Sequence, residues 1–169
     1  MYKIEITEGC LSFEYLINGI TFDNCTEATF REVLHSLIQQ LDAKEIVNEI
    51  IDCIDVIHYG HDLSNYRFEV RNLWEYVCYM INNYDDPVDE YSDKVHEMDA
   101  IIDNLNDDEV TELRNYLLKF IEKEVLKDPG WIQQMLRDLV STNPHSKYEN
   151  FGVCNSCGDV VDKYTLVIE

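Results

Sequence analysis

The chain has 169 residues, of which 46% are hydrophobic, and its 34 acidic residues against 13 basic ones give a formal net charge of −21. That charge argues against direct binding to a nucleic-acid backbone or to an anionic membrane, because both are negative. The chain is long enough for one core, and it has neither a membrane-length apolar stretch nor an apolar run of signal-peptide length at its start. We therefore expect one cytoplasmic domain, residues 1–169, whose surface suits a basic protein partner.

The first 23 residues predict three β-strands. Residues 2–7 alternate between apolar and polar side chains, and residues 11–17 and 20–22 flank Asn18-Gly19. Asn-Gly is a strong hairpin signal, because both central positions of a type I′ turn need a positive φ. Residues 160–168 predict a further strand at the other end of the chain. Since this strand needs a sheet to join, we expect the two ends of the chain to meet in one small antiparallel sheet.

Six helices are predicted between these strands, from apolar positions at helical intervals. These positions fall within residues 30–41, 46–57, 70–84, 88–105, 110–121 and 131–139. Helix starts are indicated by N-cap signals at four places: Asn24 with Glu27, Asp42 with Glu45, Asn106 with Glu109, and Asp128-Pro129. Residues 142–150 are expected to form a loop. The predicted fold class is α+β, with a sheet from residues 1–23 and 151–169 packed with a helical middle, residues 24–141.

Two cysteines near the end of the chain have the spacing of a metal-binding knuckle. Cys154 and Cys157 are three positions apart, and Gly158 follows directly, so that both sulfurs can face one ion. If the first three strands form a meander, Cys10 and Cys25 fall at the edge of the sheet where the last strand begins. The sequence therefore predicts a structural zinc site with the thiolate ligands Cys10, Cys25, Cys154 and Cys157, and with His145 as the reserve ligand.

Two other interpretations of this pair stay open. The cysteines can be ordinary thiols in a turn, or a redox pair of the thioredoxin type. The redox type places its motif at a helix N-terminus, whereas the valine-rich stretch after Gly158 predicts a strand. Cys53 and Cys78 lie within helical patterns and are expected to be packing residues.

An acidic segment covers residues 85–128, in which 15 residues are acidic and 5 are basic. Asp89, Asp93 and Glu97 follow one another at intervals of four, so they stack on one helix face about 6 Å apart. A row of carboxylates comparable in density to a phosphate strand can occupy a basic channel built for nucleic acid. The alternative is a solvent-facing stripe without a partner. The predicted partner-binding residues are Asp85, Asp86, Asp89, Glu90, Asp93 and Glu97.

Motifs of enzymatic chemistry are scarce in this sequence. It contains no Gly-x-Ser-x-Gly, no phosphate-binding glycine-rich loop and no His-Glu-x-x-His. His58 and His61 are the most interesting histidine pair, but histidines at the end of a helix are explained by the helix dipole. We therefore expect a protein that is not an enzyme.

In its thiol knuckle and its acidic segment the chain resembles small acidic phage proteins that neutralise bacterial defences, in particular anti-CRISPR inhibitors of type II effector nucleases. The resemblance is one of class, without a shared motif. It implies a non-enzymatic inhibitor that blocks nucleic-acid loading of a basic effector nuclease in the host cytoplasm. An immunity protein, an antitoxin or a transcription-regulating adaptor fits the acidity and the number of helices equally well.

Overall fold

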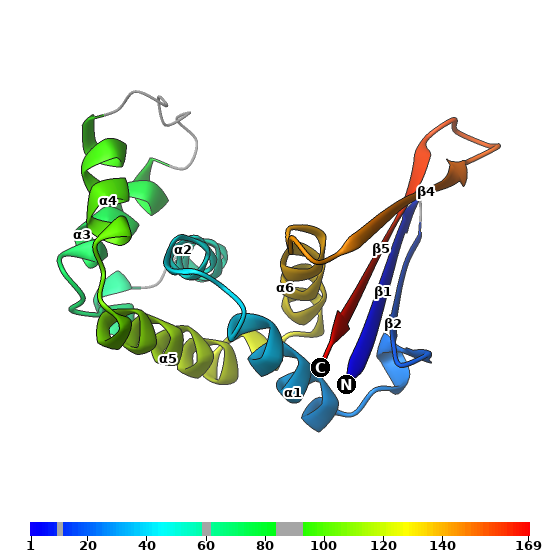
Figure 1. The fold of residues 1–169 in the computed structure, drawn as a ribbon, viewed down its shortest axis with the longest axis horizontal. Coiled ribbons are helices and arrows are strands. Elements are labelled where there is room, and N and C mark those ends of the chain that lie inside the picture. Colours follow the sequence, from blue (N-terminus) through cyan, green and yellow to red (C-terminus); the bar gives the residue numbers. More distant parts are fainter. Residues whose placement is uncertain (10–11, 59–61, 84–92) are drawn as a thin grey trace. The chain divides into compact units, whose positions relative to one another are not determined.

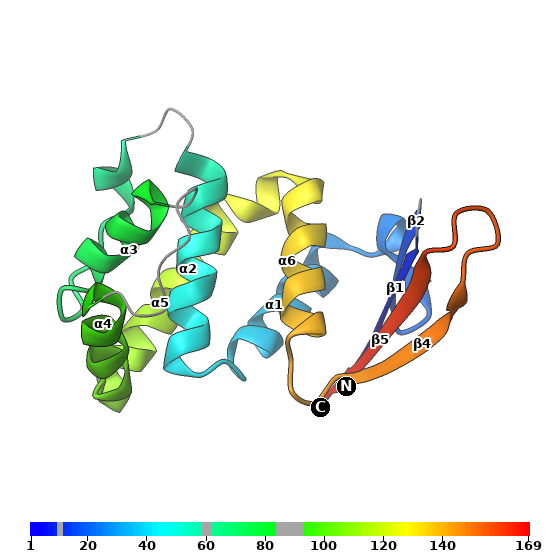
Figure 2. The same ribbon diagram turned by 90° about the horizontal axis from the view of Figure 1, so that it is seen from above.

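The computed structural model describes all residues of the chain except 10–11, 59–61 and 84–92. Within these described residues, six α-helices and a five-stranded antiparallel sheet confirm the predicted α+β class. The chain divides into a sheet unit, Met1–Leu37 with Leu126–Glu169, and a helical unit, Ile38–Val125, whose helices and longer strands are labelled in Figures 1 and 2. In the part of the chain that is described, no helix is long and apolar enough to cross a membrane.

The sheet unit brings the two ends of the chain together, as predicted. Tyr2 pairs with Ile168, and the labels N and C lie side by side in Figure 1. All neighbouring strands are antiparallel, in the spatial order β3-β2-β1-β5-β4. The strands are β1 (Tyr2–Gly9), β2 (Ser12–Ile17), β3 (Ile20–Thr21), β4 (Lys147–Val153) and β5 (Val160–Ile168).

The predicted Asn18-Gly19 hairpin is confirmed. Asn18 has a φ of 53° and Gly19 a φ of 80°, which is the pair of positive values that a type I′ turn requires. The Asn18 amide donates to the carbonyl of Lys3 at 2.7 Å, and the Lys3 amide donates to the Asn18 Oδ1 at 2.8 Å. The turn therefore joins β2 to β3 and is also tied to the central strand β1.

The prediction of a loop over residues 142–150 is wrong, because β4 begins at Lys147. This strand lies at the edge of the sheet, and most of its side chains are exposed, so its sequence lacks the apolar alternation that marks a half-buried strand. Contacts with β5 hold it in place. The Tyr148 and Tyr164 rings lie 5.4 Å apart, and the Tyr148 hydroxyl donates to Asp162 at 2.7 Å.

One face of the sheet is covered and the other is open. Ile4, Ile6 and Leu166 are at most 1% exposed and share the covered face, on which helix α6 (Pro129–Ser141) packs. Arg137 of α6 forms an ion pair of 2.5 Å with Glu8 of β1. The predicted helical middle therefore spans both units, because α6 and helix α1 (Glu27–Ile38) belong with the sheet.

The described residues of the helical unit form four α-helices with a shared apolar core. Its helices are α2 (Ala43–His58), α3 (Leu73–Asn82), α4 (Asp93–Asp103) and α5 (Asp107–Lys123). The prediction that the fourth helix starts near residue 88 falls on residues outside the described part. Side chains that are at most 1% exposed fill the core: Ile46, Ile50, Ile54, Leu73, Leu113 and Leu117.

Most of the predicted helix starts are confirmed. In the Asp42 and Asn106 boxes, the cap side chain accepts from the third helical amide and the returning glutamate accepts from the cap amide, at 2.7 to 2.9 Å. Asp128 caps α6 through the amide of Gly130 at 2.7 Å. The expected Asn24 cap is wrong, since a 3₁₀ turn (Phe22–Asn24) takes up this segment and Thr26 caps α1 through the Thr29 amide.

Glu109 makes the capping box of α5 sensitive to pH. The hydrogen bond from the Asn106 amide, and then the Arg71 guanidinium at 2.5 Å, lower the pKa of Glu109 below its ordinary value of 4.5. A lowered folded-state pKa stabilises the fold above pH 4.5, and this stabilisation is lost as pH falls through the folded-state pKa.

We therefore predict that Glu109→Gln lowers stability at neutral pH and that the difference from the parent shrinks below pH 4.5. Glutamine keeps the capping geometry and removes only the charge. Urea denaturation at a series of pH values measures the difference, and a difference that is constant over the acidic range would contradict the prediction.

Candidate functional site

Cys154 and Cys157 lie in the turn that connects β4 to β5. The Gly158 amide donates to the Cys154 carbonyl and the Cys154 amide donates to the Asp159 carbonyl, both at 2.8 Å. Gly158 has a φ of 79°, a conformation in which a side chain would be strained. The Cys154 sulfur lies 3.0 Å from the Ser156 hydroxyl, and Cys157 is exposed. Cys154 and Cys157 therefore lie in a tight, hydrogen-bonded turn, and a metal bound by their two sulfurs stays a prediction.

The structure does not bring Cys25 to this turn. Because Glu8 pairs with Asp162, the turn lies at the end of the sheet where β1 finishes. The Cys25 sulfur contacts the carbonyl of Ile20 at 3.9 Å, close to the Asn18-Gly19 turn at the opposite end. The predicted convergence of Cys25 is wrong because β3 has only two residues and stops before it crosses the sheet.

The structure describes the position of one of the other two predicted ligands, His145, but not that of Cys10. His145 lies two residues before Lys147, which pairs with Thr165, and is therefore also far along the sheet from the knuckle. Cys10 lies outside the described residues. Within the described part of the chain, no group of three His, Cys, Asp or Glu side chains can hold a metal ion. The described residues therefore supply two thiols to the predicted zinc site, which is half of a closed tetrahedral set.

We predict that zinc in the purified chain depends on the knuckle and not on Cys25. Cys154→Ser with Cys157→Ser should remove the metal and lower the melting temperature, because a structural metal contributes folding free energy. Cys25→Ser should keep the parental zinc content, since its sulfur lies at the other end of the sheet. Elemental analysis of protein purified without chelator measures both. A parent without zinc, or equal loss in Cys25→Ser, would contradict the prediction.

Two of the predicted acidic residues fall in the described part of the chain. Asp93 and Glu97 lie one turn apart on α4, are exposed, and make no ion pair with any described residue. Asp99, on the inner side of the same helix, pairs with Lys44 of α2 at 2.9 Å. The remaining predicted carboxylates, Asp85, Asp86, Asp89 and Glu90, lie outside the described residues.

The exposed carboxylates continue beyond the predicted set. Asp103 ends α4, Asp107 and Asp108 begin α5, and Glu112 follows one turn later, all of them exposed. Asp107 and Asp108 also stand in the first turn of α5, where acidic side chains stabilise a helix N-terminus. A carboxylate at a helix start can also bind a basic partner, because its contact with the helix amides leaves part of the side chain in solvent.

Charge is distributed unequally between the two units. Residues 38–125 contain 22 acidic and 7 basic residues, a net charge of −15, whereas the sheet unit contains 12 acidic and 6 basic residues, a net charge of −6. The helical unit therefore carries most of the excess, and α4 and the first turns of α5 expose several of its carboxylates. We call the exposed residues Asp93, Glu97, Asp103, Asp107, Asp108 and Glu112 the acidic surface.

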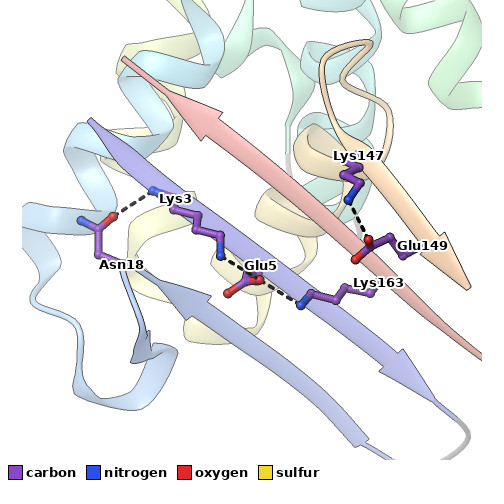
Figure 3. Close-up of polar contacts among 6 residues, drawn as sticks. All are labelled: Lys3, Glu5, Asn18, Lys147, Glu149 and Lys163. Carbon is purple, nitrogen blue, oxygen red and sulfur yellow. Dashed lines mark hydrogen bonds and ion pairs between the residues drawn. The ribbon is translucent and has the colours of Figure 1, made fainter. Parts of the chain in front are cut away.

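The open face of the sheet has a different, balanced pattern. Figure 3 shows Glu5 between Lys3 and Lys163, at 3.1 and 2.9 Å, and Lys147 beside Glu149 at 2.7 Å. The Lys163 ammonium, and to a smaller extent Lys3, lowers the pKa of Glu5. Because each lysine of this face has a carboxylate partner, the face adds little net charge. The acidic surface of the helical unit is the stronger candidate for charge-driven binding.

The chain was also compared with known proteins. No protein-family model, no curated protein and no solved structure matches it. The candidate function therefore follows from the charge distribution and the geometry of the chain's own residues.

Proposed function

We propose that this protein is a non-enzymatic inhibitor whose acidic surface binds a basic nucleic-acid-handling protein. The observation that carries the proposal is the exposure of Asp93 and Glu97, one turn apart on α4, without an ion-pair partner among the described residues. Like charges at this spacing destabilise an isolated helix by a few tenths of a kcal/mol. Cationic side chains of a basic partner would offset this repulsion and attract both carboxylates.

The spacing of the charges supports a partner that ordinarily holds nucleic acid. Residues four apart on a helix are separated by about 6 Å along the axis, and a nucleic-acid strand carries one phosphate per roughly 3.4 Å. Asp93 and Glu97 on α4 have about half that density, and the first turn of α5 adds Asp107 and Asp108. We expect these carboxylates to suit a groove lined with lysine and arginine, in which they compete with the natural ligand.

The resemblance to anti-CRISPR proteins narrows the proposed partner to a type II effector nuclease. In this proposal the acidic surface occupies part of the nucleic-acid channel of the nuclease and prevents loading. Long-range attraction between a chain of charge −21 and such a channel accelerates encounter, and this contribution falls as salt rises.

The test compares the parent with Asp93→Lys combined with Glu97→Lys. With a type II effector nuclease as partner, the reversal should lower the association rate at least about tenfold, because rim charges act mainly on encounter. Binding by the parent should weaken with salt and with added double-stranded DNA. Real-time binding at several salt concentrations measures these effects.

Glu14→Lys combined with Asp23→Lys is the matched control. Both residues are exposed in the sheet unit, and the pair changes the net charge by the same amount. This control should keep most of the parental association rate. Equal rates in the two double variants, or binding that is indifferent to salt and to DNA, would show that Asp93 and Glu97 are ordinary solvated surface.

A further inference from the structure

A groove of about 550 Å³ lies within the helical unit, between residues 67–70 and the outer side of α5. Residues 66–71 run antiparallel to this helix. The Tyr66 and Phe120 rings lie 5.3 Å apart, and Arg71 pairs with Glu109 near the start of α5. The groove is lined by the following residues: Arg67, Phe68, Glu69, Val70, Asp108, Thr111, Glu112, Leu113, Asn115, Tyr116 and Lys119.

Residues 67–70 have the pattern of a strand without a sheet. Phe68 and Val70 are buried, whereas Arg67 and Glu69 are exposed and form an ion pair of 2.8 Å on the outer side. Arg67 has the extended dihedral angles φ −59° and ψ 140°. This alternation is the period of two that a half-buried β-strand shows. The segment ends where positive φ values at the next two residues turn the chain into α3.

The backbone of this segment is open to a partner strand. Among the described residues, the amides of Phe68, Glu69 and Val70 and the carbonyls of Arg67, Phe68 and Glu69 make no hydrogen bond to another residue. An extended segment in this state is a template for strand addition, in which main-chain hydrogen bonds provide affinity and neighbouring side chains provide specificity. Residues 67–70 lie along one wall of the groove, and the outer side of α5 forms the other.

The two ends of the groove carry opposite charges. Lys119 lies at one end, and Asp108 and Glu112 lie towards the other, with Phe68, Leu113 and Tyr116 between them, whereas Arg67 and Glu69 neutralise each other in their ion pair. From residue 108 to residue 119 the helix rises about 16 Å, which matches about five residues of extended chain. A ligand that fills the groove therefore meets carboxylates at one end and the Lys119 ammonium at the other.

We propose that this groove binds an extended peptide of a partner protein, which adds as a strand to residues 67–70. The peptide carries a basic side chain towards Asp108 and Glu112 and an acidic side chain towards Lys119. An apolar side chain in its middle contacts Phe68 and Tyr116. The groove shares Asp108 and Glu112 with the acidic surface, but this inference does not depend on Asp93, on Glu97 or on a CRISPR partner.

The test is a selection from a displayed library of random eight-residue peptides. Peptides enriched on the parent should share one order of charge, with a basic residue towards one end and an acidic residue towards the other. Glu112→Lys combined with Lys119→Glu keeps the net charge and exchanges the two ends of the groove. Selection on this variant should enrich peptides with the opposite order.

The matched control is Glu75→Lys combined with Lys123→Glu, which makes the same exchange at exposed residues outside the lining of the groove. It should enrich the parental order. Circular dichroism and the melting temperature of each variant show that the helices are retained. No enrichment on the parent, as expected if the occupant is a small molecule or an ion, would overturn the proposal, and so would the same charge order in all three selections.

A second measurement tests the main-chain pairing itself. Addition of an enriched peptide to the parent should slow amide hydrogen exchange within residues 68–70 by about tenfold or more, because amides in a new ladder exchange only when it opens. Amides in α6 should keep their rates. Binding of the peptide without any slowing in residues 68–70 would rule out strand addition.

Discussion

Replacing Leu117 with alanine is expected to lower the free energy of unfolding by about 2–5 kcal/mol. The Leu117 side chain is 0% exposed in the middle of α5, and α5 packs on α2 within the helical unit. Truncation removes buried methyl groups and leaves a cavity that the rigid helices fill only in part.

Lys123→Ala near the end of the same helix is the control, because the Lys123 side chain is 68% exposed and, among the described residues, pairs only with the adjacent Glu124 at 3.5 Å. It should change stability by less than about 0.5 kcal/mol. Urea denaturation of the three proteins at one pH measures the difference. A loss below 1 kcal/mol in Leu117→Ala would show that the core around α5 repacks without cost.

Ile6→Ala is expected to destabilise the sheet unit by a similar amount, about 2–5 kcal/mol. Ile6 is 0% exposed on β1, between β2 and β5, and it faces the side of the sheet on which α6 packs. Because β1 lies between β2 and β5, a cavity at Ile6 weakens the packing of both neighbouring strands.

Val167→Ala tests the two-faced character of the sheet. Val167 is 53% exposed on β5 and pairs with Lys3, whose side chain belongs to the open face. Its truncation should cost less than about 1 kcal/mol. Denaturant midpoints of the two variants, compared with the parent, measure the contrast. Equal losses would mean that the open face is covered in solution.

Short-range signals in the sequence predicted the fold well where they coincide with a physical requirement. Asn18-Gly19 requires positive φ, and the structure has it. The capping boxes at Asp42 and Asn106 satisfy amides that a helix leaves without partners, so their positions mark true helix starts. At the turn and at these helix starts, the structure preferred by the local sequence is the one found in the fold.

The prediction failed where the outcome depends on contacts between distant residues. β4 is recognisable only through its pairing with β5, because its own side chains are mostly exposed. Cys25 was assigned to the knuckle on the assumption of a full third strand, and the length of β3 is set by its pairing with only two residues of β2. The groove beside residues 67–70 is likewise a tertiary feature. In the sequence its only trace is the alternation of Phe68 and Val70 with charged neighbours.

The pairing of β1 with β5 also has a consequence for synthesis of the chain. β1 is made long before its neighbour β5, with more than 150 residues between Tyr2 and Val160. The helical unit is continuous in sequence and can form its core before β5 is made. The sheet can close only once β5 has been made, and closing so long a loop costs conformational entropy before the contacts between the strands form. Until then the apolar face of β1 is without its partner strand, so this early stretch is where a nascent chain is most exposed to chaperones and to aggregation.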